Sequence, residues 1–85
     1  MLFRSRLTGL IQRFERVNVG GEQWQAQVAM HFRLDREDMP LLQRTYRAEI
    51  PADGASIEAT VRAFALAIDR CFSELRRDMA DLAES

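Results

Sequence analysis

The chain has 85 residues, of which 47% are hydrophobic and 29% charged, and its formal net charge is −1. These totals indicate one small globular domain with a marginal core, and they argue against a disordered chain or a dedicated nucleic-acid-binding protein. No apolar run approaches the ~18 residues of a transmembrane helix, and the single Cys71 excludes an internal disulfide.

The N-terminal segment, residues 2–17, fits two structures. Its bulky apolar residues follow a helical spacing, and a strand fits them less regularly. Gly9 disfavours a helix interior by about 1 kcal/mol, and the NVGG sequence of residues 18–21 suits a hairpin turn. We therefore expect a strand over about residues 9–17, with a helix as the alternative and residues 1–8 as a segment that could be disordered.

The next two elements are predicted strands. Residues 24–34, WQAQVAMHFRL, alternate between apolar and polar side chains, which is typical of a strand with one face on a core. Residues 35–40, DREDMP, form a turn cluster. A second strand is expected over residues 41–50, and Pro51 is expected to end it. Strands this close in sequence pair as an antiparallel hairpin. The face of the second strand that we expect on the core carries Leu42, Tyr46, Ala48 and Ile50.

An amphipathic helix is predicted from Ser56, which is a suitable N-cap with Glu58 in the first turn. Its apolar residues recur every three or four positions and form one stripe. The residues of this predicted core stripe are Ile57, Val61, Phe64, Ile68, Cys71 and Leu75, continued by Met79 and Leu82. Leu66 points away from the stripe. It is a candidate partner contact together with Met79 and Leu82.

These elements predict an α+β fold: a three-stranded antiparallel β-meander followed by one long helix on one face, β-β-β-α. A helix of ~26 residues is about 39 Å long, whereas a compact globule of this chain length is about 31 Å across. We therefore expect the helix to extend beyond its own domain, so that its last turns fray or lie on another surface. The sheet also has a second face and two unprotected edges. Residues 1–85 accordingly form a single domain that could be half of a larger one.

The residues offer little for catalysis, cofactors or metals. There is no CxxC, HxxxH, phosphate loop or nucleophile motif. Cys71 falls on the apolar stripe and His31 on the polar side of its strand, so an enzyme that uses both is the weakest alternative. Trp24, Phe32 and Tyr46 could form a nucleotide-stacking platform, but the first two share their face with core residues. We expect no enzyme activity, no cofactor, no metal and no nucleic-acid partner.

Charge is unevenly distributed along the chain. Residues 1–19 hold four Arg and one Glu, a net +3, and residues 51–85 hold four Arg and seven acidic residues, a net −3. Such asymmetry is compatible with scattered solvated charge, with head-to-tail assembly, or with a membrane surface beneath residues 2–17.

Residues 41–79, LLQRTYRAEIPADGASIEATVRAFALAIDRCFSELRRDM, resemble the C-terminal half of the ABC-type transport auxiliary lipoprotein family. That family has an aromatic strand ending in a hydrophobic-Pro step, a polar link, and a helix with a hydrophobic-x-Ala start and recurring alanines. LIQRFERV and WQAQVAMHFRL resemble its paired strands, so the likeness covers about residues 9–80. The matching residues of the second strand and helix are Tyr46, Ile50-Pro51, Val61-Arg62-Ala63-Phe64, Ala67 and Leu75.

The resemblance implies a periplasmic, non-enzymatic accessory protein. Members are anchored through an acylated N-terminal Cys and accompany ABC transporters whose MCE-type component moves phospholipid. This sequence departs from the family because the lipobox, the first half of the domain and any signal peptide are missing. The expected partners are an MCE-type protein or an ABC permease, together with a second copy of the chain as a homodimer or higher oligomer. The alternative function is a small self-associating adaptor or regulatory module unrelated to transport.

Overall fold

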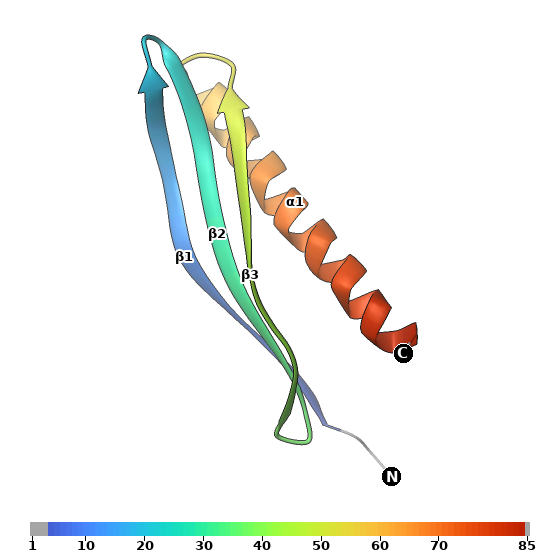
Figure 1. Cartoon of the computed structure of the whole chain (residues 1–85). Helices are drawn as coiled ribbons and strands as arrows, with labels where there is room; N and C mark the ends of the chain where they lie inside the picture. Colours follow the sequence, from blue (N-terminus) through green and yellow to red (C-terminus); the bar gives the residue numbers. More distant parts are fainter. Residues whose placement is uncertain (1–3, 85) are drawn as a thin grey trace.

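The computed structural model describes residues 4–84. Three strands form one antiparallel sheet in the order β1-β2-β3, and a single helix follows (Figure 1). The α+β, β-β-β-α fold predicted from the sequence is confirmed. The elements are β1 (Ser5–Gly20), β2 (Gln23–Arg36), β3 (Met39–Ala52) and α1 (Ile57–Glu84).

Both hairpin turns use residues with positive φ. Gly20 and Gly21 have φ of 131° and 58°, and the Oδ1 atom of Asn18 accepts a hydrogen bond of 2.8 Å from the Gly20 N–H. Between β2 and β3, Glu37 and Asp38 have φ of 52° and 65°. Two consecutive left-handed residues match the twist of the flanking strands in a two-residue hairpin. The predicted turn cluster of residues 35–40 is therefore reduced to its two central residues.

The N-terminal segment is a strand, so the helical alternative is wrong. β1 begins at Ser5, so disorder is wrong for residues 5–8, while residues 1–3 lie outside the described residues. A Cβ atom on Gly9 would lie 2.8 Å from Cε1 of Phe32, so glycine leaves room for the Phe32 ring against β1. The register shifts between Ile11 and Arg13, which indicates a β-bulge at Gln12.

The core lies between α1 and one face of β2 and β3. The alternation predicted for both strands is confirmed. Pro51 was expected to end β3, but it lies within the strand, and one further residue follows it. A proline is tolerated at this position because β3 is an edge strand. Ser56 Oγ accepts a hydrogen bond of 3.1 Å from the Ala59 N–H, as expected for an N-cap. The buried core residues are Ala26, Val28, Met30, Phe32, Tyr46, Ala48, Ile50, Ala63, Ala67, Cys71 and Leu75.

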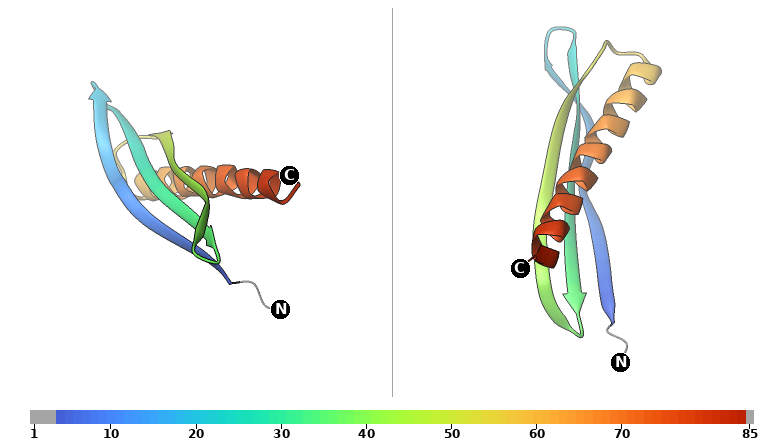
Figure 2. Two further views of the ribbon diagram at one scale, coloured as in Figure 1. Left: turned by 60° about the horizontal axis from the view of Figure 1, so that its bottom comes forward. Right: turned by 90° about the vertical axis from the view of Figure 1, so that its right-hand side faces the viewer.

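The helix face on the sheet differs from the predicted stripe. Cys71 and Leu75 are buried and Phe64 and Ile68 half-buried, but Ile57 and Val61 are 81% and 61% exposed, so the prediction is wrong for these two. The buried line instead follows steps of four residues, each of which rotates about 40° around the helix. The helix crosses the sheet diagonally (Figure 2). Because of this crossing, the residues that face the sheet shift gradually around the helix from one turn to the next. The buried line comprises Ala59, Ala63, Ala67, Cys71 and Leu75.

The molecule is long, measuring 56 × 21 × 19 Å, with a radius of gyration of 16.0 Å against about 12 Å for a compact domain of this length. β1 has 16 residues and spans about 53 Å, whereas the 28 residues of α1 span about 42 Å. The compact globule assumed in the expectation that the helix extends beyond its own domain was therefore wrong. α1 packs on β3 as far as Asp78, to which Tyr46 donates a hydrogen bond, and residues 80–82 beyond it are exposed.

Candidate interaction surface

The face of β1 that α1 leaves uncovered is apolar. In the register of the sheet, Leu7 pairs with Leu34, Ile11 with Met30 and Phe14 with Val28. Paired residues share a face of the sheet, so this row of β1 lies on the same face as the core. Ile11 and Phe14 are nevertheless 62% and 51% exposed. The helix packs on β2 and β3 and touches β1 only near its own first turns.

The flank of α1 toward β1 continues this apolar surface. Phe14 of β1 stacks on Phe64 of α1 with ring centroids 4.2 Å apart and an interplanar angle of 11°. Phe72 packs on Phe32 at 5.5 Å, and Val61 lies one turn before Phe64. We call this surface the apolar strip. It consists of Leu7, Ile11 and Phe14 of β1 and Ile57, Val61, Phe64, Ile68 and Phe72 of α1.

Arg16 joins the two walls of the apolar strip at the start of the helix. Its Nη1 atom donates hydrogen bonds to the carbonyl of Ala55 at 3.2 Å and to Oγ1 of Thr60 at 3.4 Å. The guanidinium also lies 4.3 Å from the ring centroid of Trp24, a cation–π contact. β1 is therefore held to the first turn of α1 while most of its length stays uncovered.

A polar cluster joins the other end of the helix to β3. The Tyr46 hydroxyl donates a hydrogen bond of 2.6 Å to Oδ2 of Asp78, and Arg44 donates to the same oxygen at 3.0 Å. Burial and the neighbouring Asp78 raise the pKa of Tyr46 to about 12. The hydrogen bond from Tyr46, followed by that from Arg44, lowers the pKa of Asp78. The cluster anchors the helix. The sequence feature that could have indicated this cluster is a tyrosine on a predicted core face, because a buried hydroxyl needs a hydrogen-bond partner.

The structure separates Cys71 from His31. Cys71 is buried between α1 and β3, where its Sγ lies 3.7 Å from the Tyr46 carbonyl, and burial raises the pKa of its thiol. His31 is on the helix-free face of the sheet, with Nδ1 2.9 Å from Oγ1 of Thr45. A sheet therefore lies between the two side chains, and this arrangement offers no way for the imidazole to activate the thiol.

The three candidate partner contacts on the helix have different environments. Leu66 is 58% exposed, on the side of α1 away from the sheet. Met79 is partly buried against the core, and Leu82 is exposed near the end of the helix. None of the three belongs to the apolar strip. The apolar strip was not predicted as an exposed surface, because Ile57 and Val61 were assigned to the core.

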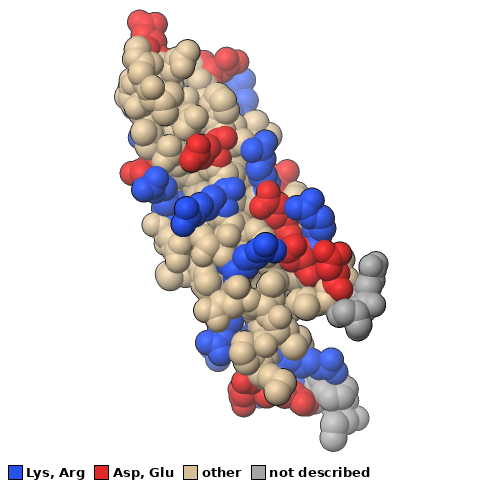
Figure 3. All heavy atoms as spheres, viewed as in Figure 1, with Lys and Arg blue, Asp and Glu red and all other residues tan. Residues whose placement is uncertain are grey.

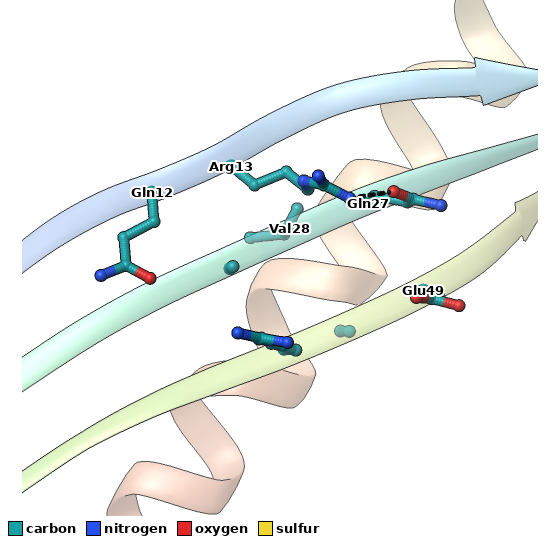
Figure 4. Close-up of a pocket in the computed structure, with 8 residues that line it drawn as sticks. Gln12, Arg13, Gln27, Val28 and Glu49 are labelled. Carbon is teal, nitrogen blue, oxygen red and sulfur yellow. Dashed lines mark hydrogen bonds between the residues drawn. The ribbon is translucent and has the colours of Figure 1, made fainter.

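The helix-free face of the sheet is mostly polar, although Leu10, which pairs with His31, is 62% exposed there. A shallow depression of ≈ 300 Å³ is lined by side chains of all three strands, among them Gln12 and Arg13 of β1, Gln27 of β2 and Glu49 of β3 (Figure 4). Arg13 donates to Oε1 of Gln27 at 2.8 Å and lies 3.3 Å from a carboxylate oxygen of Glu15. Charges of both signs mix over this side of the molecule (Figure 3). Its chemistry is that of a solvated surface.

Within residues 4–84, no group of three or more His, Cys, Asp and Glu residues is placed to hold a metal ion. The one helix of the described chain falls short of the length and apolarity needed to cross a membrane. Comparison of the chain with known protein families, with curated proteins and with solved structures found no match.

Proposed function

We propose that this chain is a non-catalytic protein-interaction module and that the apolar strip is its binding surface. One observation carries the proposal: β1 presents Leu7, Ile11 and Phe14 on the core face of the sheet, yet their side chains stay 46%, 62% and 51% exposed. Contiguous exposed apolar surface of this kind marks contact sites in soluble proteins. Because each of these side chains is about half exposed, covering the remainder contributes about 1 kcal/mol per side chain.

The resemblance to ABC-type transport auxiliary lipoproteins supports a more specific proposal. In it, the module is an accessory component of a phospholipid-transporting ABC system in the periplasm, and its partner is an MCE-type protein or the permease. The support consists of the sequence likeness of β3 and α1, including Tyr46 and Val61. A self-associating adaptor unrelated to transport is the second candidate, because the apolar strip by itself does not depend on a transporter.

Photo-crosslinking tests the proposal. The photoreactive amino acid p-benzoylphenylalanine replaces Val61 in the apolar strip, and a control chain carries it at Leu66, which is similarly exposed but on the other side of the helix. Each chain is mixed with purified MCE-type and permease components. We expect adducts of position 61 with one of these components or with a second copy of the chain, and few adducts from position 66. Equal or absent adducts at both positions, or a measurable turnover of substrate by the chain, would contradict the proposal.

A further inference from the structure

We propose that a second copy of this chain covers the apolar strip, with α1 of each copy lying on β1 of the other. This inference rests on the proposed function and names the partner of that surface. Three observations support it: the accessible area of the chain, the two-walled shape of the apolar strip, and the distribution of charge along the chain.

The accessible area is larger than a monomer of this size requires. The chain exposes 6400 Å², whereas a monomeric protein of 9.8 kDa exposes about 5,200 Å². The excess of about 1,200 Å² exceeds the roughly 800 Å² that each partner buries in a standard protein–protein interface. One standard interface per chain would remove about two-thirds of this excess.

The shape of the apolar strip is self-complementary. One wall is the β1 row with Ile11 and Phe14, and the other is the helix flank with Ile57 and Val61. A two-fold axis places the helix flank of each copy on the β1 row of the other, so both walls are covered by one isologous interface. The helix then lies between two sheets, packed on β2 and β3 of its own chain and on β1 of its partner.

Charge favours this arrangement over pairing of two β1 edges. Residues 4–19 carry a net charge of +3 from four Arg and one Glu, and residues 51–84 carry −3 from four Arg and seven acidic residues. On α1, Glu58 and Asp69 follow apolar-strip residues and are exposed. Arg6 and Arg13 lie on the helix-free face of β1, so the attraction is between the net charges of the two segments rather than between contacting side chains. A helix on the partner's β1 brings segments of opposite net charge together, whereas β1 against β1 opposes two basic strands.

Light scattering of the full chain tests whether the second copy binds. Across about a hundredfold range of concentration, we expect a mass of twice 9.8 kDa. Val61→Arg places a charge in the apolar strip and should halve the mass, and Ile57→Glu should do the same. Leu66→Arg is the matched control on the other side of the helix and should stay dimeric. Both Val61 and Leu66 are exposed, so neither substitution disturbs the core. A monomer at all concentrations would overturn the inference.

Disulfide trapping then distinguishes the arrangement. In a Cys71→Ala background, one chain carries Ile11→Cys and another Val61→Cys. We expect the mixed disulfide between the two chains to exceed either self-disulfide severalfold. Dominant self-disulfides of the Ile11→Cys chain would show β1 pairing and would overturn the inference. If the chain is monomeric but position 61 still crosslinks to a transporter component, the proposed function stands and only the second copy as partner is refuted.

Discussion

The Tyr46 hydroxyl shows how a single buried polar group fixes the position of the helix. It lies on the core face of β3, and its one carboxylate partner, Asp78, comes from α1. The sequence placed Tyr46 correctly on the core face. The sequence did not predict its pairing with Asp78, because side-chain pairing across 32 residues depends on how the helix crosses the sheet.

Removing this hydroxyl should destabilise the protein and change its alkaline titration. We expect Tyr46→Phe to lower the free energy of unfolding by about 1 kcal/mol at neutral pH. Tyr46 is the only tyrosine, so tyrosinate absorbance reports it directly, and the folded chain should titrate near 12 rather than 10.0. Because the unfolded chain loses this proton first, wild-type stability should fall as the pH rises from 10 toward 12, and the variant should lack that fall. A native titration near 10 would contradict the assignment.

Acid should also weaken this cluster, through protonation of Asp78. The pKa of Asp78 is lowered in the folded chain, so the stability that its carboxylate contributes is fully present above its ordinary value of 3.8. That contribution is lost as the pH falls through the lower folded pKa. Urea unfolding of the wild type and of Tyr46→Phe at matched acidic pH values measures it, and the wild type should lose more stability.

At the scale of elements, small residues decide where α1 lies. Ala63 and Ala67 face the sheet, and the bulky Ile57 and Val61 are placed on the flank. The apolar periodicity identified the helix correctly, since a period of 3.6 is a local property of the sequence. Whether the buried line or the predicted core stripe faces the sheet depends on the angle at which the helix crosses it. The apolar periodicity carries no information about that angle.

A larger residue at the centre of this line should push the helix away from the sheet. Ala67 is fully buried, so we expect Ala67→Leu to destabilise the protein by about 1–3 kcal/mol through overpacking. Ala80→Leu is the matched control, because Ala80 is exposed on the same helix and should change stability little. Denaturant unfolding of both variants measures the difference. Equal stability of the two variants would show that the buried line of α1 is not tightly packed against the sheet.

β1 was the element for which the sequence favoured a strand, over about residues 9–17, but kept a helix as the alternative. The bulge at Gln12 shifts the alternation, so that Leu7 and Ile11 share a face with Phe14 rather than with Arg13. A bulge breaks the period of two without creating a period of 3.6. The segment therefore fitted neither template well, and only its pairing along β2 shows that it is a strand.

The molecule as a whole is elongated rather than compact. Its long axis of 56 Å follows strands of 14 to 16 residues, and a single helix covers two of the three. Lone β-meanders with one helix bury limited surface. The compact shape that we assumed for a domain of this size was wrong.

If a second copy covers the apolar strip, the stability of the whole molecule depends on concentration. We expect Tm to rise with protein concentration for the wild type, because association stabilises the folded state by mass action. The Tm of Val61→Arg should stay constant over the same range. Differential scanning calorimetry at several concentrations measures both, and a constant wild-type Tm would argue for a monomer whose core is sufficient by itself.

The sequence by itself determined the order of elements, the hairpin between β2 and β3, the N-cap at Ser56 and the core faces of β2 and β3. Each of these follows from local periodicity or turn chemistry. Only the tertiary structure decided which face of α1 meets the sheet, how Tyr46 and Asp78 meet, and that β1 keeps an uncovered apolar row. The physical reason is that these features depend on the angle at which the helix crosses a twisted sheet. That angle is set by the packing of residues far apart in the chain.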